Sequence, residues 1–103
     1  MEIIENVNLV KKANIYFDGK VTSRSFIENG EKKSLGIMMP GTYNFGTDEA
    51  ELMEIIDGDV DVKLKGQESW NKYTVGTSFN VQANSGFDIK VNVITDYCCS
   101  YIK

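Results

Sequence analysis

Histidine is missing from this chain: none of the 103 residues is one. Imidazole is the commonest metal ligand among protein side chains. An iron-dependent oxygenase without it would need a site built from Asp, Glu or Cys alone, which is a poor ligand set for ferrous iron. The sequence therefore argues against a metal-dependent dioxygenase and predicts that no metal ion is bound.

Positive charge is also in short supply. Lysine and arginine together number 11 against 15 aspartates and glutamates, so the net charge is −4 at pH 7. Proteins that bind nucleic acid normally present a basic face that neutralises phosphates. We therefore expect no nucleic-acid partner, although a single local cation would still suffice for a small anionic ligand.

Long apolar runs and spaced cysteines are absent as well. No segment approaches the roughly 18 apolar residues that cross a membrane, and residues 1–6 lack the basic and apolar regions of a signal peptide. The two cysteines, Cys98 and Cys99, are adjacent, so in a strand they point to opposite faces and would form a poor disulfide. These features favour a cytoplasmic protein with two reduced thiols and no membrane partner.

What the chain does contain is a series of short segments with the period of a β-strand. Apolar residues take every second position in residues 59–65 and 87–93, as expected for strands with one buried face. Nine glycines recur along the chain, several of them as turn signals beside such segments. Further candidate strands are residues 21–27, 35–39, 42–45, 53–56, 77–81 and 97–102. This spacing predicts an all-β sandwich or barrel in a single domain.

Two segments are ambiguous. Residues 1–13 carry apolar residues at near-helical spacing, and we interpret them as an N-terminal extension, either a short arm or a frayed terminus, of a domain that spans residues 14–103. Residues 47–54 read locally as a helix start, since Asp48 and Glu51 have capping-box spacing. The strand-rich surroundings favour instead a loop that leads into a strand.

Two stretches follow the order of the two conserved cupin motifs. Glu51 precedes Gly58 by seven residues, which is the spacing of the glutamate and glycine that close the first motif. Residues 76–88 occupy the place of the second motif, with Gln82 where a proline is usual and Asp88 near the place of the third histidine. The chain thus resembles the cupins, and the resemblance implies an all-β, cupin-type double-stranded β-helix, or jelly-roll barrel.

A longer series of segments resembles one cupin family in particular. The segments are residues 16–21, 36–38, 40–47, 78–85 and 97–101. In order and spacing they are similar to the small cupin-type pyrimidine/purine nucleoside phosphorylases, from about Asn14 to the end of the chain. The resemblance implies phosphorolysis, in which inorganic phosphate attacks the sugar C1 of a nucleoside and gives a free base and ribose 1-phosphate. It further implies phosphate as a co-substrate with no cofactor, and a homodimer by family analogy.

Carboxylates are natural candidates for this chemistry, because the transition state places positive charge on the sugar ring. Glu49 and Glu51 lie two residues apart, so in an extended segment they face the same side. If that side is the barrel interior, one would accept hydrogen bonds from ribose hydroxyls and the other would favour the cationic ring. The alternative is that both belong to a solvated acidic loop.

Phosphate recognition needs a cation. Arg24 is the only arginine and suits bidentate contact with phosphate. The alternatives are three lysines, Lys32, Lys33 and Lys90. Lys90 shares a strand face with Asp88, so if one of them lines the barrel interior, both do.

A nucleobase calls for a flat aromatic wall, because every base has a π face. Tyr43 and Phe45 share one face of their predicted strand, and Phe79 lies on another strand. Asn84 is a candidate for hydrogen bonds to base or sugar edges. The alternative is that these aromatic residues form the core and that Asn84 is a turn residue.

Two functions therefore remain open at the level of sequence. The first is an enzyme, a nucleoside phosphorylase, and the second is a non-catalytic cupin that binds a small ligand. A phosphorylase needs a cation in the same cavity as its carboxylates, whereas a simple binding protein does not. The deciding feature is whether Arg24 or a lysine faces the cavity that holds Glu49 and Glu51.

Overall fold

The computed structural model describes all 103 residues, and the fold is built from β-strands with one short 3-10 turn, η1 (Phe17–Gly19). The strands are β1 (Asn8–Leu9), β2 (Asn14–Tyr16), β3 (Val21–Glu28), β4 (Glu31–Met38), β5 (Gly41–Thr47), β6 (Ala50–Asp57), β7 (Asp59–Leu64), β8 (Asn71–Thr74), β9 (Ser78–Val81), β10 (Ser85–Val91) and β11 (Thr95–Ile102). The all-β class predicted from the sequence is confirmed. No helix of the chain is long and apolar enough to span a membrane.

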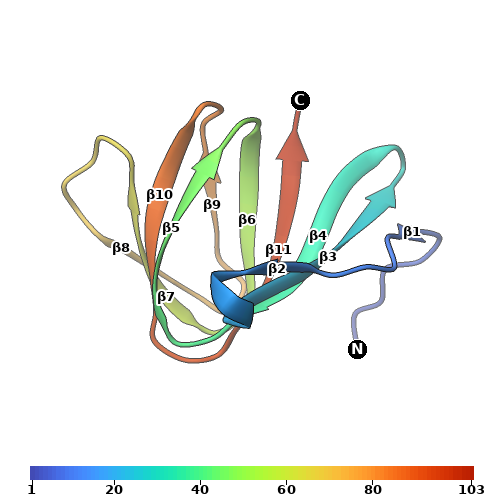
Figure 1. Cartoon of the computed structure of the whole chain (residues 1–103), viewed down its shortest axis with the longest axis horizontal. Helices are drawn as coiled ribbons and strands as arrows, with labels where there is room; N and C mark the ends of the chain where they lie inside the picture. The colour runs from blue at the N-terminus through green and yellow to red at the C-terminus, as the bar shows by residue number, and fades with distance from the viewer.

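The strands form two antiparallel sheets whose inner faces share one core. The first sheet has the order β1-β3-β4-β11-β6-β9, with β2 paired to β3, and the second has the order β5-β10-β7-β8. Val60, Val62 and Ile89, at most 1% exposed, contribute to this core. In Figure 1 the second sheet stands at the left and the β3–β4 hairpin at the right. The alternation of apolar and polar residues therefore translates directly into one buried and one outer face for each sheet.

The segment β2–η1 connects the two sheets on one side of the barrel. The Phe17 ring packs 5.0 Å from the ring of Tyr43 and 5.4 Å from that of Phe45, measured between centroids. Tyr16 adds an edge-on contact to Phe45 at 6.3 Å. These aromatic contacts tie the first sheet to strand β5 of the second sheet and cover the barrel there.

Residues 47–54 form a turn and a strand, so the loop interpretation is confirmed and the local helix signal is wrong. Thr47 ends β5, and its hydroxyl donates to the Gln82 carbonyl at 2.6 Å and accepts from the Ser85 amide at 3.1 Å. The backbone N–H of Asn84 donates to the backbone carbonyl of Asp48 at 3.2 Å. Pairing with the β9–β10 turn and with strands on both sides of β6 therefore outweighs the capping-box propensity.

The N-terminal residues form no helix. Asn8 and Leu9 pair with Ile27 and Phe26 of β3, and the Val10 amide donates to the Ser25 carbonyl at 2.8 Å. The apolar side chains whose spacing suggested a helix are largely exposed, so no buried face rewards helix formation. This segment is an arm laid along the edge of the first sheet.

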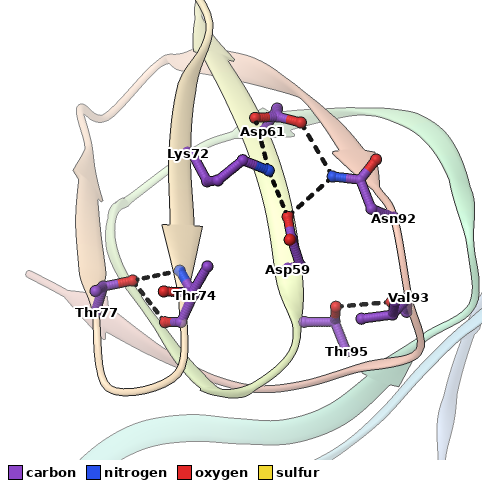
Figure 2. Close-up of polar contacts among 8 residues, drawn as sticks. All are labelled: Asp59, Asp61, Lys72, Thr74, Thr77, Asn92, Val93 and Thr95. Carbon is purple, nitrogen blue, oxygen red and sulfur yellow. Dashed lines mark hydrogen bonds and ion pairs between the residues drawn. The ribbon is translucent and has the colours of Figure 1, made fainter.

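The end of the barrel away from the C-terminus is held by a polar network. Lys72 forms ion pairs with Asp59 at 2.6 Å and with Asp61 at 3.4 Å. The Asn92 amide donates to both carboxylates at 3.0 Å (Figure 2). The Lys72 ammonium and the Asn92 amide lower the pKa of Asp59. The network joins β7, β8 and the β10–β11 connection on the outer face of the second sheet.

Candidate functional site

The open end of the barrel leads into a cavity of about 300 Å³ between the two sheets. The turns that join β3 to β4, β5 to β6 and β9 to β10 lie at this end, together with the C-terminus (Figure 1). The cavity is lined from several of these elements, and its side chains fall into an acidic group, a lysine, a hydroxyl and thiol group, and an aromatic wall. Its volume is at the lower end of the range of small-molecule pockets, which is roughly 300–1,000 Å³.

The acidic group comes from the β5–β6 connection and the start of β6. Asp48, Glu49 and Glu51 all line the cavity, with Glu49 exposed and Glu51 half-buried. Burial raises the pKa of Glu51 above its ordinary value, and a hydrogen bond with the Cys99 thiol offsets part of that rise. The two glutamates therefore face the interior at different depths, as the spacing of two residues allows.

One cationic side chain lines the same cavity, and it is Lys32 of β4. Its ammonium nitrogen lies 5.0 Å from the centroid of the Tyr101 ring, in cation–π contact. The next residue, Lys33, instead pairs with Glu28 at 2.8 Å, and this contact raises the pKa of Lys33. Strand alternation thus separates two adjacent lysines.

Hydroxyl and thiol groups lie along β11 and its neighbour β4. Glu51 stands directly opposite Tyr101 across the β6–β11 pair, and Ser34 stands opposite Cys99 across the β4–β11 pair. The Ser34 and Tyr101 hydroxyl oxygens are 3.5 Å apart. Burial raises the pKa of Tyr101 to about 12 and raises the pKa of Cys99. These groups are therefore neutral at pH 7 and serve as hydrogen-bond donors.

The aromatic wall is on the second sheet. The rings of Phe45 and Phe87 are stacked, with centroids 5.5 Å apart and planes at 27°. Both rings line the cavity, and the Tyr16 ring completes the wall from β2. The wall gives the cavity a flat apolar surface across from the polar groups of the first sheet.

Three residues predicted for the site line this cavity, namely Glu49, Glu51 and Phe45. Arg24 lies on the outer face of the first sheet, where its Nε donates to the Lys11 carbonyl at 3.4 Å, and it does not line the cavity. Tyr43 is buried in the core, with its hydroxyl bound to the Met39 carbonyl at 2.6 Å. The structure therefore separates the only arginine from the carboxylates.

The remaining predicted residues also lie elsewhere. Phe79 is part of the core, and Asn84 has a left-handed φ of 52° in the β9–β10 turn. Lys90 packs over the Trp70 ring at 5.0 Å on the outer face of the second sheet. Asp88 shares that face and accepts a hydrogen bond from the Asn44 side-chain amide at 2.8 Å. It lines a second cavity of about 400 Å³ together with Lys63 and Lys65.

Sequence reasoning missed Ser23, Ser34 and Cys99 as lining residues. They carry small polar side chains on strands, where a serine or cysteine gives no signal of its own. Strand parity holds the information, because Ser34 shares a face with Lys32 and Cys99 shares one with Tyr101. The deciding feature named from the sequence is nonetheless present, since a lysine faces the cavity of Glu49 and Glu51.

Comparison with known proteins places this geometry in a family. A family model described as pyrimidine/purine nucleoside phosphorylase matches residues 11–101. A protein of that name from Leptospira interrogans serogroup Icterohaemorrhagiae serovar copenhageni is 59% identical over 104 residues, which span 100% of this chain and 98% of the relative. The match includes the N-terminal arm.

Solved structures support the fold. A protein of unknown function from Acinetobacter sp. ADP1 superposes with a TM-score of 0.93 at 35% identity, over 97% of this chain and 98% of that one. An RmlC-like cupin from Shewanella frigidimarina NCIMB 400 gives a TM-score of 0.70 at 12% identity, over 87% and 81% of the two chains, which bears on the fold alone. The cupin fold expected from the sequence is confirmed, and the chain belongs to the pyrimidine/purine nucleoside phosphorylase family.

Proposed function

We propose that the protein catalyses the phosphorolysis of purine and pyrimidine nucleosides. A phosphate oxygen forms a bond to the sugar C1 while the bond from C1 to the base nitrogen breaks. The electron pair leaves with the base, and the proton of hydrogen phosphate balances the one that the released base takes up. The observation that supports this proposal is one cavity that holds a lysine, three carboxylates and a flat aromatic wall.

Electrostatic stabilisation of the sugar is the first task of the site. As the base departs, positive charge develops on the ring oxygen and C1, and a fixed carboxylate nearby lowers the energy of that state. Glu49, at the exposed rim, supplies this charge in our proposal. Glu51 lies deeper beside Cys99 and Tyr101 and holds the ribose hydroxyls, which fixes the sugar for attack.

Breadth across purines and pyrimidines follows from the aromatic wall. Stacking on Phe45 and Phe87 depends on the π face that all nucleobases share. Recognition by hydrogen bonds to one base edge would instead discriminate sharply between bases. A wall without an edge-specific partner therefore supports a broad substrate range.

We propose that the reaction proceeds without a metal ion. The chain has no histidine, and no group of three or more Cys, Asp or Glu side chains is arranged to hold a metal. The lysine ammonium and the hydroxyl donors take the place that a Lewis acid would have beside phosphate. Chelators should therefore leave the activity intact.

The proposal is tested by incubating purified protein with inosine, adenosine or uridine and inorganic phosphate. We expect release of the free base and formation of ribose 1-phosphate, measured by chromatography and unaffected by EDTA. Omission of phosphate should abolish the release. If no base appears and a nucleoside still raises the melting temperature, the protein is a non-catalytic ligand-binding cupin and the proposal fails.

We also propose that the chain works as a homodimer in the cytoplasm. Cys98 and Cys99 are unpaired and buried, which suits a reducing compartment. Burial raises the pKa of Cys98 to about 11, so its thiol stays protonated and unreactive at neutral pH.

A further inference from the structure

We infer that Lys32 and the hydroxyl groups beside it form the subsite that binds inorganic phosphate. The inference rests on the proposed phosphorolysis and names the position of its co-substrate. Lys32 is the one lysine or arginine among the residues that line the cavity, whereas Arg24 lies outside it. Phosphate needs a positive partner, and a lysine ammonium provides a compact one.

Lys32 is an exposed lysine that lines the cavity and whose charge has no carboxylate partner. Lys33 has a carboxylate partner in Glu28, and Lys72 has partners in Asp59 and Asp61, but Lys32 forms no ion pair. Its ammonium instead rests 5.0 Å from the Tyr101 ring centroid. The ring positions the charge at the cavity wall, and no carboxylate neutralises it, so the charge is available to an anion.

Two hydroxyl groups complete the subsite. Ser34 lies two residues after Lys32 on the same strand face and is buried. Its hydroxyl oxygen lies 3.5 Å from that of Tyr101. Phosphate presents several acceptor oxygens, and a tetrahedral ion can accept from an ammonium and from both hydroxyls at once. The three donors come from β4 and β11.

The distance to the carboxylates suits a pentose between them and the phosphate. In the first sheet β11 separates β4, which carries Lys32, from β6, which carries Glu51. Adjacent strands are ~4.8 Å apart, so β4 and β6 are separated by about 10 Å. Tyr101 of β11 lies between the two, opposite Glu51, so the subsite adjoins the carboxylate that we propose for the sugar. The stacked Phe45 and Phe87 rings lie on the other sheet, where a departing base would leave on the face opposite the attack.

Kinetics of Lys32→Ala test the inference, with Lys33→Ala as the matched control. We expect Lys32→Ala to raise the KM for phosphate by about tenfold or more, since a hydrogen bond to a charged group is lost. The KM for the nucleoside should change by less than about twofold. Lys32→Arg should restore part of the phosphate affinity, and Lys33→Ala should behave as wild type, with circular dichroism confirming that each variant folds.

Calorimetric titration with inorganic phosphate alone separates this subsite from the proposed function. Phosphate should bind Lys32→Ala at least about tenfold more weakly than it binds wild type. If Lys32→Ala releases base with an unchanged KM for phosphate, the subsite is wrong and the phosphorylase proposal stands. The same conclusion follows if Arg24→Ala, and not Lys32→Ala, loses phosphate affinity. Phosphate binding through Lys32 without any base release would contradict the phosphorylase proposal and support the subsite. Absence of both binding and turnover would overturn both.

Discussion

Glu51 meets two opposing demands at the scale of a single residue. It faces the cavity from a half-buried position, where burial raises its pKa from the ordinary 4.5. The Cys99 thiol offsets only part of that penalty. A carboxyl group kept in an unfavourable environment beside a cavity is typical of a functional residue.

Removing the charge of Glu51 should therefore cost activity. We expect Glu51→Gln to lower kcat for phosphorolysis by more than about tenfold, because the group that holds the ribose hydroxyls in the transition state loses its charge. Steady-state kinetics with inosine and phosphate measure the effect. Equal turnover in Glu51→Gln and wild type would remove Glu51 from the mechanism.

The same substitution should stabilise the protein at neutral pH. The pKa of Glu51 is higher in the folded protein than in the unfolded chain, so the folded protein binds more protons at pH values between the two. The free energy of unfolding therefore falls as pH rises through that window and Glu51 ionises. Glutamine has no such ionisation. The melting temperature of Glu51→Gln should thus exceed that of wild type by more at about pH 8 than at about pH 4. A difference in melting temperature that does not change with pH would contradict this interpretation.

Lys32 shows why the site was only partly predictable from single residues. The turn Asn29-Gly30 is a two-residue hairpin signal, and it sets Glu28 opposite Glu31. The sequence thus contains the register that places Lys32 and Lys33 on opposite faces. It does not reveal which face is inner, because β3 buries residues of both parities, with Ser23 inside and Phe26 outside. The sequence therefore favours Arg24 over Lys32, because a guanidinium suits bidentate contact with phosphate.

At the scale of elements, the acidic rim of the cavity depends on one hydroxyl. Thr47 is 6% exposed and binds the Gln82 carbonyl and the Ser85 amide. These bonds join the β5–β6 and β9–β10 turns at the cavity entrance. The turn forms without a proline, and the Thr47 bonds and the left-handed Asn84 contribute to its shape.

Thr47→Val keeps the volume of the side chain and removes both bonds. We expect a loss of about 1–3 kcal/mol in the free energy of unfolding, because a carbonyl and an amide that are both part-buried lose their partner. Urea denaturation measures the loss. Thr42→Val, an exposed change on the same strand, is the control and should differ little from wild type. If the two variants prove equally stable, Thr47 does not hold the turns together.

Elements with a strong alternating pattern were predictable, and weakly buried ones were not. The predicted strands at residues 59–65 and 87–93 correspond to β7 and β10, whose alternate residues are buried. Strand β8 has a single half-buried residue, Tyr73, and β1 has none, so neither carries a period-2 signal. Edge strands of this kind owe their structure to pairing with a neighbour, which a local pattern does not encode.

At the scale of the whole molecule, the outer face of the first sheet carries several exposed apolar side chains. Leu35, Ile37 and Ile56 are 37%, 38% and 42% exposed, and the Cys98 side chain lies between β4 and β6 on that face. An apolar patch on a sheet face is typical of a protein interface. The occupant that we propose is a second copy of this chain.

Charge placement favours that occupant. Strand pairing sets Arg24, Leu35, Cys98 and Glu54 in one row across β3, β4, β11 and β6. A two-fold axis along the strands between β4 and β11 reverses the row in the second copy. Arg24 of each copy then meets Glu54 of the other around an apolar centre, which gives the only arginine a structural role outside the cavity.

Light scattering after size-exclusion chromatography should therefore give wild type a mass of twice the 11.6 kDa chain. Leu35→Asp places a charge at the centre of the apolar row, where burial in an interface is costly, and should yield the monomer mass. Val75→Asp, at an exposed apolar residue outside the row, controls for added charge and should remain dimeric. Arg24→Glu should weaken the dimer, and combination with Glu54→Arg should restore it, because the swapped pair keeps opposite charges across the two-fold axis. A monomeric wild type, or a dimer insensitive to Leu35→Asp, would show that this face is not the interface.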